Sequence, residues 1–402
     1  RRGLPFRTHH EETTLMIPPK SRDSAADLRV AGRRSTAAIR WAVVITAMAC
    51  PGSGTAGSEI ADRFVHRRDG LDPVAIDRAS ASEDGLRVVR IDRGLDREEV
   101  IPWDQISAID PRPDGAGLEV GLDRWLEIGD RLWRGRVRLR RGDAKLATEA
   151  FQQAMEGKPG MSGRAAAVAI EGLVASAIFG GRSSEVFAEA AFLGELALVD
   201  RRSDRFVGAA YGGGVVDVAW SLVPSVPPVG VDGSESADVR RRLRAFPELD
   251  EASALRRDLW LRLIDGRSAP KDIPERGLDP GTRFLADLAS LDSEDPAIRE
   301  RVRRKLLDDL DQAPAWRIAW IRHRIGRSSI VHAEDDAAQI RGVLDLVHAL
   351  ALEDAAPAIP RLDAARTAAA ALRTLNRIEE AELLESMLLL EFPDQKPTEN
   401  AS

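Results

Sequence analysis

The spacing of apolar residues changes near residue 120, and this change constrains the fold more than any other feature of the chain. From Asp72 to Asp110 apolar and polar residues tend to alternate, which predicts short β-strands. From Gly121 onward apolar residues recur every three or four positions, which predicts amphipathic helices. Strands followed by a long run of helices favour a mainly α fold, in which a small β module precedes a helical array.

The β module is expected within residues 58–110, where turn residues separate short apolar runs. Three strands are predicted, at 73–77, 86–92 and 99–104, and a further apolar stretch follows at 106–109. Residues 58–68, ahead of these strands, have a helix-like pattern. The strands predict a β-meander curled into a partial barrel that resembles SH3 or Sm modules. Trp103 is expected to be a core aromatic residue rather than a ligand platform, because tryptophan usually buries most of its surface.

The first helices carry small and aromatic residues at a recognisable spacing. The residues concerned are Gly135, Gly142, Asp143, Ala147, Phe151, Ala154 and Pro159. This spacing resembles the second half of a tetratricopeptide repeat, in which small residues let two helices approach and an aromatic ring fills the gap. A second helical hairpin is predicted at 161–179 and 184–198. The resemblance returns near the end of the chain, at Ala369, Leu372, Ala381, Leu388 and Pro393.

Breaks in pattern and composition divide the chain into seven segments. They are an export signal with its upstream extension (1–49), the β module (58–110), a Pro/Gly linker (111–120), a tetratricopeptide-like helical domain (121–220), a Pro/Gly-rich loop (221–238), a second helical region (239–393) and a polar tail (394–402). In the second helical region, helices are predicted at 239–245, 250–263, 280–291, 296–310, 315–325 and 335–352, and two more follow.

The segment before residue 50 has the three parts of a bacterial export signal. Arg33, Arg34 and Arg40 supply the positive region, and Trp41 to Ala49 supply a short apolar core. Ala47 and Ala49 are small residues at the two positions that a signal peptidase reads. The core is too short to span a bilayer, which takes about 20 apolar residues. We therefore expect export to the periplasm or the cell envelope.

Cys50 is the single cysteine, so an intramolecular disulfide is excluded. Its position directly after Ala-Met-Ala is similar to a bacterial lipobox, in which the cysteine carries the lipid. The pattern departs at Ala47, where a large aliphatic residue is usual. Two outcomes stay open: ordinary cleavage, or a membrane tether through a lipid on Cys50.

One glycine motif offers a different function. Gly52, Gly54 and Gly57 fit the G-x-G-x-x-G spacing of a dinucleotide-binding loop, and Asp77 follows at a distance suited to a ribose hydroxyl. A motif of this kind counts only inside a βαβ unit, and no further βαβ pattern follows. Nucleotide binding through Gly52–Gly57 is therefore kept as the alternative reading.

Other catalytic and metal-binding patterns are not found in the sequence. The serine elbow G-x-S-x-G and the phosphate loop ending in Gly-Lys-Ser/Thr are absent. His66 stands beside two arginines, and His323, His332 and His348 do not have the spacing of metal ligands. Asp335, close to His332, suits the N-terminus of a helix. Trp316 and Trp320 share one helix face, which favours packing over a ligand cradle.

The charge of the chain bears on its partners. The formal net charge of −7 argues against long duplex nucleic acid as a ligand. The resemblance to tetratricopeptide arrays implies a protein-binding or envelope-scaffold role through a helical face, with an unidentified protein partner. No catalytic, cofactor-binding or metal-ligating residue is predicted, and the oligomeric state is left open. The alternative is an enzyme, either nucleotide-binding through Gly52–Gly57 or a hydrolase whose site forms only in three dimensions.

Overall fold

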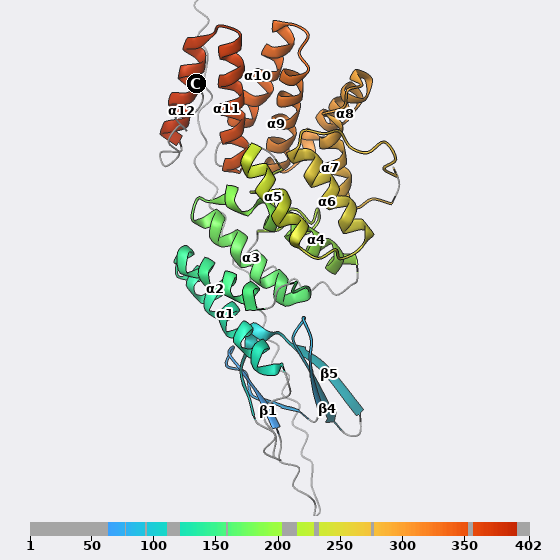
Figure 1. Cartoon of the computed structure of the whole chain (residues 1–402), viewed down its shortest axis with the longest axis vertical. Coiled ribbons are helices and arrows are strands. Elements are labelled where there is room, and N and C mark those ends of the chain that lie inside the picture. The colour runs from blue at the N-terminus through green and yellow to red at the C-terminus, as the bar shows by residue number, and fades with distance from the viewer. Residues whose placement is uncertain are drawn as a thin grey trace, which may run out of the picture. The chain divides into compact units, whose positions relative to one another are not determined.

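A computed structural model gives the fold of most of the chain after residue 62. It describes residues 63–76, 78–92, 95–110, 121–157, 160–202, 215–228, 233–274, 277–352 and 357–391. The export signal, Cys50, the Gly52–Gly57 loop, Asp77 and Pro393 lie outside the described residues. In the described part, strands come first and helices follow in chain order, as the colours of Figure 1 show. The prediction of a mainly helical fold preceded by β-structure is confirmed.

The β-structure consists of two antiparallel sheets of three strands each. One sheet has the order β2-β1-β6, formed by β2 (Val74–Ile76), β1 (Arg63–Arg67) and β6 (Ile106–Ile109). The other has the order β3-β4-β5, formed by β3 (Arg78–Ala81), β4 (Leu86–Asp92) and β5 (Leu95–Ile101). Two sheets therefore replace the single three-stranded meander that the sequence predicts.

The helix-like reading of residues 58–68 is wrong for Arg63–Arg67, which form strand β1. This segment pairs with β2 on one side and β6 on the other, so Val65 faces the shared core and is fully buried. Pairing with two strands that come later in the chain outweighs the local pattern, which is a weak guide in so short a segment. Leu86, Val88 and Ile101 from the other sheet are buried too.

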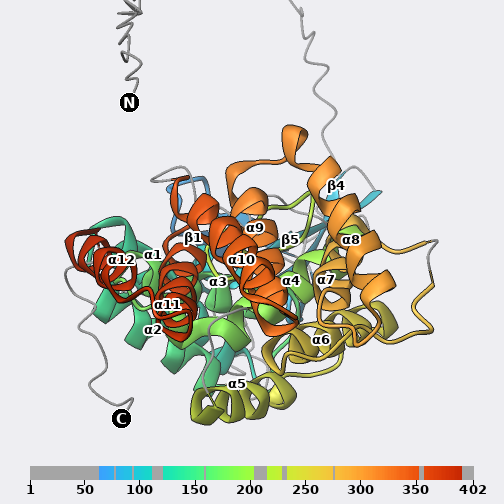
Figure 2. The ribbon, with the colours of Figure 1, turned by 90° about the horizontal axis from the view of Figure 1, so that it is seen from above.

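Twelve helices are described, and each packs mainly on its neighbours in the chain. Their bounds are α1 Leu122–Arg140, α2 Ala144–Gly157, α3 Gly163–Phe179, α4 Phe187–Arg202, α5 Gly233–Ala245, α6 Glu251–Ile264, α7 Pro280–Ser290, α8 Pro296–Asp308, α9 Ala315–Val331, α10 Asp336–Leu350, α11 Ala358–Thr374 and α12 Ile378–Glu391. Figure 2 shows α9 to α12 side by side. Within the described residues, no helix combines the length and the apolar character needed to cross a bilayer.

The helix ends follow the expected signals, with one exception. Pro280 and Pro296 occupy first-turn positions, and the side chain of Asp335 caps α10 by accepting the Ala338 amide at 2.6 Å. The exception is α5, which begins at Gly233 although residues 221–238 were expected to form a loop. Serine and acidic residues near its start suit a helix N-terminus. Burial of Val239 and Leu243 in the core stabilises the remainder of the helix.

Phe151 explains how the first three helices approach one another. Its ring is fully buried and lies where a Cβ on Gly135 of α1 would come within 2.7 Å, and one on Gly172 of α3 within 2.2 Å. Only glycine leaves room for the ring on both sides. The expectation that Phe151 fills the gap beside a small residue at 135 is confirmed, and Gly172 is a second such residue.

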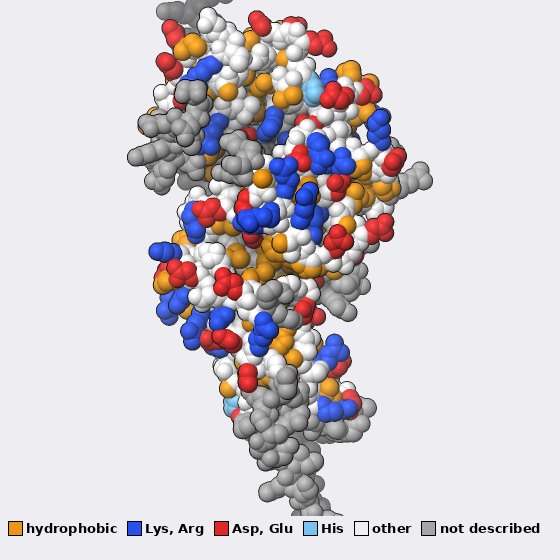
Figure 3. Space-filling view, viewed as in Figure 1, with side chains coloured by type: hydrophobic (Ala, Val, Ile, Leu, Met, Phe, Trp, Pro, Cys, Tyr) orange, Lys and Arg blue, Asp and Glu red, His pale blue; other side chains and the backbone are white. Residues whose placement is uncertain are grey.

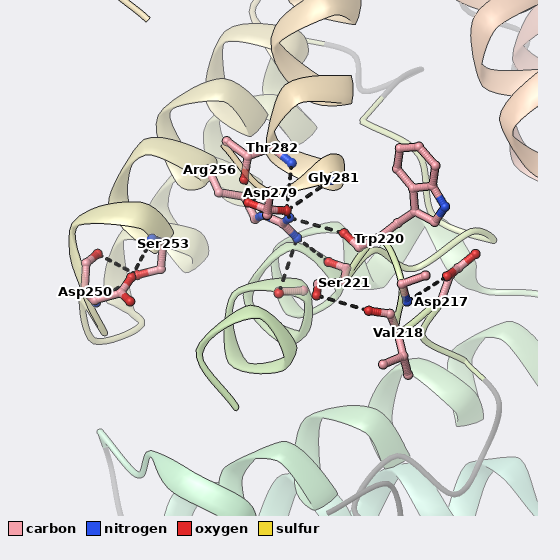
Figure 4. A network of polar contacts seen from close by, with 12 residues as sticks. Asp217, Val218, Trp220, Ser221, Asp250, Ser253, Arg256, Asp279, Gly281 and Thr282 are labelled. Carbon is pink, nitrogen blue, oxygen red and sulfur yellow. Dashed lines mark hydrogen bonds and ion pairs between the residues drawn. The ribbon is translucent and has the colours of Figure 1, made fainter. Parts of the chain in front are cut away.

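Residues 215–228 are irregular, as expected, and buried arginine bonds hold them in place (Figure 4). The guanidinium of Arg256 on α6 donates to the backbone carbonyls of Trp220 and Ser221. It also bonds Asp279 at 2.5 Å, and its Nε donates to Thr282 at 3.1 Å, both at the start of α7. One side chain thus joins α6, α7 and the irregular segment.

Many exposed charges of the helices are paired. In Figure 3, Lys and Arg side chains are interleaved with Asp and Glu over the viewed face. On α5, Arg240 bonds Asp265 at 2.7 Å and Arg242 bonds Glu189 at 3.2 Å. Such pairs link successive helices to one another.

Candidate functional site

The β-structure packs on the first helices through a pair of tryptophans. Trp103 lies at the end of β5 and stacks on Trp125 of α1, with ring centroids 5.4 Å apart and planes 6° apart. Its indole N–H donates to the carbonyl of Ser82 at 2.8 Å. Trp103 is 1% exposed, which confirms that it is a core residue. Gly129 lets α1 approach, because a Cβ there would lie 2.3 Å from the Trp103 carbonyl oxygen.

The turn between β3 and β4 holds the start of α3. The carboxylate of Glu83 accepts the backbone N–H of Ser162 at 3.0 Å, and Asp84 accepts that of Arg164, also at 3.0 Å. The carbonyl of Glu83 accepts the Ala165 amide at 3.1 Å. The strands therefore cap a helix that begins about eighty residues later and fix its position beside α1.

A cavity of about 440 Å³ opens where these elements meet. Its apolar wall comes from three helices and includes Leu139, Phe151, Val168, Gly172 and Ala175. Its polar wall comes from the turn after β1, the turn after β5, α1 and α3. The polar residues are Arg68, Asp69, Asp104, Gln105, Arg136, Arg140 and Glu171, with Trp133 beside them.

The arginines of the cavity are held by different partners. Arg136 bonds the carboxylate of Asp104, whose side chain is 5% exposed. Arg68 donates to the Ile106 carbonyl at 2.8 Å and to Asp130 at 2.9 Å. Its guanidinium also lies 4.7 Å from the centre of the Trp133 ring. These contacts keep two guanidinium groups in fixed positions at the cavity wall.

The charged residues that line the cavity are balanced, with Arg68, Arg136 and Arg140 on one side of the count and Asp69, Asp104 and Glu171 on the other. Burial lowers the pKa of Arg164, and the negative charge of Asp104 opposes this shift while the positive charge of Arg136 adds to it. Two arginines thus lie around one buried carboxylate. Arg140 at the rim is exposed and has no ion-pair partner among the described residues. A carboxylate or phosphate reaching the rim would meet a guanidinium geometry that suits it.

The described lining residues can bind but do not assemble a nucleophile with a base. They include no histidine, cysteine, serine or lysine. The arrangement is an apolar wall beside a polar wall of balanced charge, with the exposed Arg140 at the rim, where a ligand with an apolar group next to a negative charge could pair with it.

The histidines have partners that the sequence analysis did not identify. His66 bonds Asp110 at 2.9 Å, and the buried His323 bonds Asp363 at 2.5 Å. Burial raises the pKa of Asp363, but the bond to His323 and nearby arginines outweigh it, so the pKa lies below its ordinary value. Asp363 is forty positions from His323, a separation that no local motif covers. Among the described residues, no group of His, Cys, Asp or Glu has the arrangement of a metal site.

Trp316 and Trp320 pack in a cluster, as expected. Their ring centroids are 5.3 Å apart, and Phe284 and Trp220 lie against them. The guanidinium carbon of Arg317 lies 4.0 Å from the centre of the Trp220 ring. Trp316 and Trp320 donate to Asp217 and to the Pro224 carbonyl, so the cluster supports the irregular segment at 215–228.

The cavity itself is not predicted by the sequence. Trp133, Arg136 and Arg140 lie at i, i+3 and i+7 on α1, which places them on one helix face. This pattern was a usable signal, but the cavity also needs residues of the β-structure and of α2 and α3, which no local spacing relates to α1. Comparison of the chain with protein-family models, with curated proteins and with solved structures gives no match.

Proposed function

We propose that the protein is an exported binding protein that captures a partner segment in the cavity between its β-structure and α1–α3. The partner segment carries a large apolar side chain next to a carboxylate. The observation that carries this proposal is a cavity of about 440 Å³ with an apolar wall and, at its rim, the exposed Arg140, which has no ion-pair partner among the described residues. The apolar group enters against Leu139 and Ala175, and the carboxylate pairs with Arg140 at the rim.

We further propose that the helices belong to a tetratricopeptide-like array and the strands to an SH3- or Sm-like module. The packing of Phe151 against Gly135 and Gly172 supports the first assignment, because small residues at helix contacts are the physical basis of such repeats. In this view the helical array supplies a rigid frame, and the strands add one wall of the binding site.

A peptide selection tests the binding proposal. A displayed random-peptide library is selected on the protein, and the affinity of the selected peptides is measured for three variants. Ala175→Phe fills the cavity and Arg140→Glu reverses the charge at its rim, so each should weaken binding at least tenfold. Arg241→Glu on α5 makes the same charge change outside the cavity, at an arginine that is 80% exposed and, among the described residues, pairs with Asp238. Peptides that bind the filled variant as well as the parent would contradict the proposal.

Export is tested separately. The intact mass of the protein recovered from its native host, with cell fractionation, reports whether residues 1–49 are removed and whether Cys50 carries a lipid. Cleavage after Ala49 without added mass indicates a periplasmic or secreted protein, and a lipid mass on Cys50 indicates an envelope anchor. A full-length chain in the cytosol would refute export.

A further inference from the structure

The last described helix has an apolar stripe on its outer side. Leu383, Met387 and Leu390 of α12 are 61%, 55% and 84% exposed. They lie at i, i+4 and i+7, so they form one line along the helix. Ala381 on the opposite side is fully buried against α11. A helix that is apolar on two sides is typical of one that is covered on both.

Acidic residues flank this stripe. Glu379 and Glu380 lie one turn before Leu383, on either side of the line, and Glu382 is exposed beside it. Glu380 also pairs with Arg377 at 2.6 Å, whereas Glu379 and Glu382 have no ion-pair partner among the described residues. The outer side of α12 is therefore an acidic amphipathic surface.

A groove with the opposite character lies on α7 and α8. It has a volume of about 980 Å³ and is bounded by residues 267–274, which follow α6. Its apolar wall includes Ile273, Leu278, Ile298 and Val302. The volume is at the upper end of the range for ligand clefts, about 300–1,000 Å³. The groove can therefore take several leucine-sized side chains.

Positive charge exceeds negative charge around the groove. The basic residues are Arg262, Arg267, Lys271, Arg283, Arg301 and Lys305, and the acids are Asp287, Glu294 and Asp295. Three of these basic residues are paired: Lys305 with Asp287 at 2.6 Å, Arg262 with Asp258 at 2.7 Å and Arg267 with Asp265 at 2.9 Å. Lys271 and Arg301 are exposed and have no ion-pair partner among the described residues. They are free to pair with an acidic partner.

We propose that α12 of one copy of the chain docks into the α7–α8 groove of a second copy. The apolar stripe enters the groove, and Glu379 and Glu382 pair with the basic rim. Apolar and charged parts match on the two surfaces, which is the requirement for a specific contact. Because the two surfaces are different, a dimer leaves the groove of one copy and α12 of the other free, and assembly continues head to tail, into a ring if the rotation closes and a filament if it does not.

A pair of complementary variants tests this proposal in the otherwise intact chain. The tail variant is Leu383→Ser with Met387→Ser, and the groove variant is Lys271→Glu with Arg301→Glu. Analytical ultracentrifugation should show concentration-dependent association of the parent that weakens with added salt. Each variant alone should associate at least tenfold more weakly. A 1:1 mixture should give a heterodimer and nothing larger, because only one intact pair of surfaces remains.

Matched controls separate this contact from general surface effects. One control, Val331→Ser with Leu344→Ser, removes exposed apolar side chains from α9 and α10. The other, Arg241→Glu with Arg244→Glu, reverses charge on α5. Each of these two double variants should associate like the parent. Circular dichroism checks that each variant is folded. The proposal is overturned if the parent stays monomeric up to high micromolar concentration, as it would if residues 392–402 or another protein covered α12. It is also overturned if the mixture does not regain association.

Discussion

The guanidinium of Arg256 lies 2.5 Å from the carboxylate of Asp279, and the arginine is completely buried. The carboxylate in turn accepts the amides of Gly281 and Thr282, which begin α7. Arg256 therefore holds the cap of one helix and, through the carbonyls of Trp220 and Ser221, an irregular segment as well. Arg256 is thus a central contact of this region, beside the tryptophan cluster that also holds the irregular segment.

Replacement of that side chain should be costly. Arg256→Met leaves the buried acceptors without a donor, so we expect a loss of about 3–5 kcal/mol in the free energy of unfolding. Arg256→Lys should recover little, because an ammonium group cannot reach acceptors on three sides. Urea denaturation followed by circular dichroism measures both values. Arg241→Met, at an exposed position, should change stability by less than about 0.5 kcal/mol. Equal losses for Arg256→Met and Arg241→Met would contradict this account.

The close approach of α1 to Trp103 should make Gly129 intolerant of a methyl group. A Cβ at this position would overlap a backbone oxygen that cannot rotate away, so Gly129→Ala should destabilise by about 1–3 kcal/mol. Gly157→Ala is the control, since its nearest neighbour is the side-chain Cγ1 atom of Ile128 at 3.3 Å, which can yield by a few tenths of an ångström, rather than a backbone atom. That change should be neutral or mildly stabilising, by up to about 1 kcal/mol. Thermal unfolding of the two variants gives the comparison.

The contact between Phe151 and Gly172 predicts a coupled pair of substitutions. Gly172→Ala should cost about 1–3 kcal/mol because its methyl group enters the space of the ring. Phe151→Ala should cost about 3–5 kcal/mol through the cavity that it leaves. The double variant should be more stable than the sum of the two losses by about 1 kcal/mol or more. Strict additivity in chemical denaturation would show that the two residues do not compete for the same volume.

The buried pair Glu195–Arg257 predicts a pH dependence of stability. Burial raises the pKa of Glu195 to about 7, although the bond to Arg257 opposes the shift. The ordinary value is 4.5, so between these two values the folded state binds more protons than the unfolded state. Stability therefore falls as pH rises from about 4.5 to about 7, by at most about 3 kcal/mol.

Glu195→Gln isolates this contribution, because glutamine does not titrate. The stability difference between parent and variant should shift in favour of the variant as pH rises from 5 to 8, measured by denaturant titration at each pH. Glu248→Gln, at an exposed position outside the pair, serves as the control for the removal of a carboxylate as such. A flat difference for Glu195→Gln would mean that Arg257 keeps the carboxylate ionised throughout.

The parts of the fold that local spacing determines were predictable from the sequence. Pro280, Pro296 and Asp335 mark helix starts by their own chemistry, and Phe151 stands at the spacing of a helix contact. Strand β1 was not predictable in this way, because Arg63–Arg67 become a strand only by pairing with β2 and β6. The Arg256 and His323 contacts join residues that are distant in the chain, and no spacing rule relates them.

The candidate site was less predictable than the fold for the same reason. Its α1 face, with Trp133, Arg136 and Arg140, is present in the helical period, but Arg68 and Asp104 reach it only after the sheets dock. The sequence motifs that had suggested chemistry, Cys50 and Gly52–Gly57, lie outside the described residues. The sequence motifs and the cavity therefore lie in different parts of the chain, since the described cavity lining runs from Arg68 to Ala175.

The capping of α3 by Glu83 and Asp84 limits how this protein can change by recombination. Three amide groups at the start of α3 have their acceptors in a turn of the β-structure. If the helices were joined to a different β-structure, these donors would lose their partners, and Gly163, whose Cβ would lie 2.8 Å from Asp84, would remain as an unsupported left-handed turn. Strands and helices are thus expected to be inherited together, as a single unit of descent.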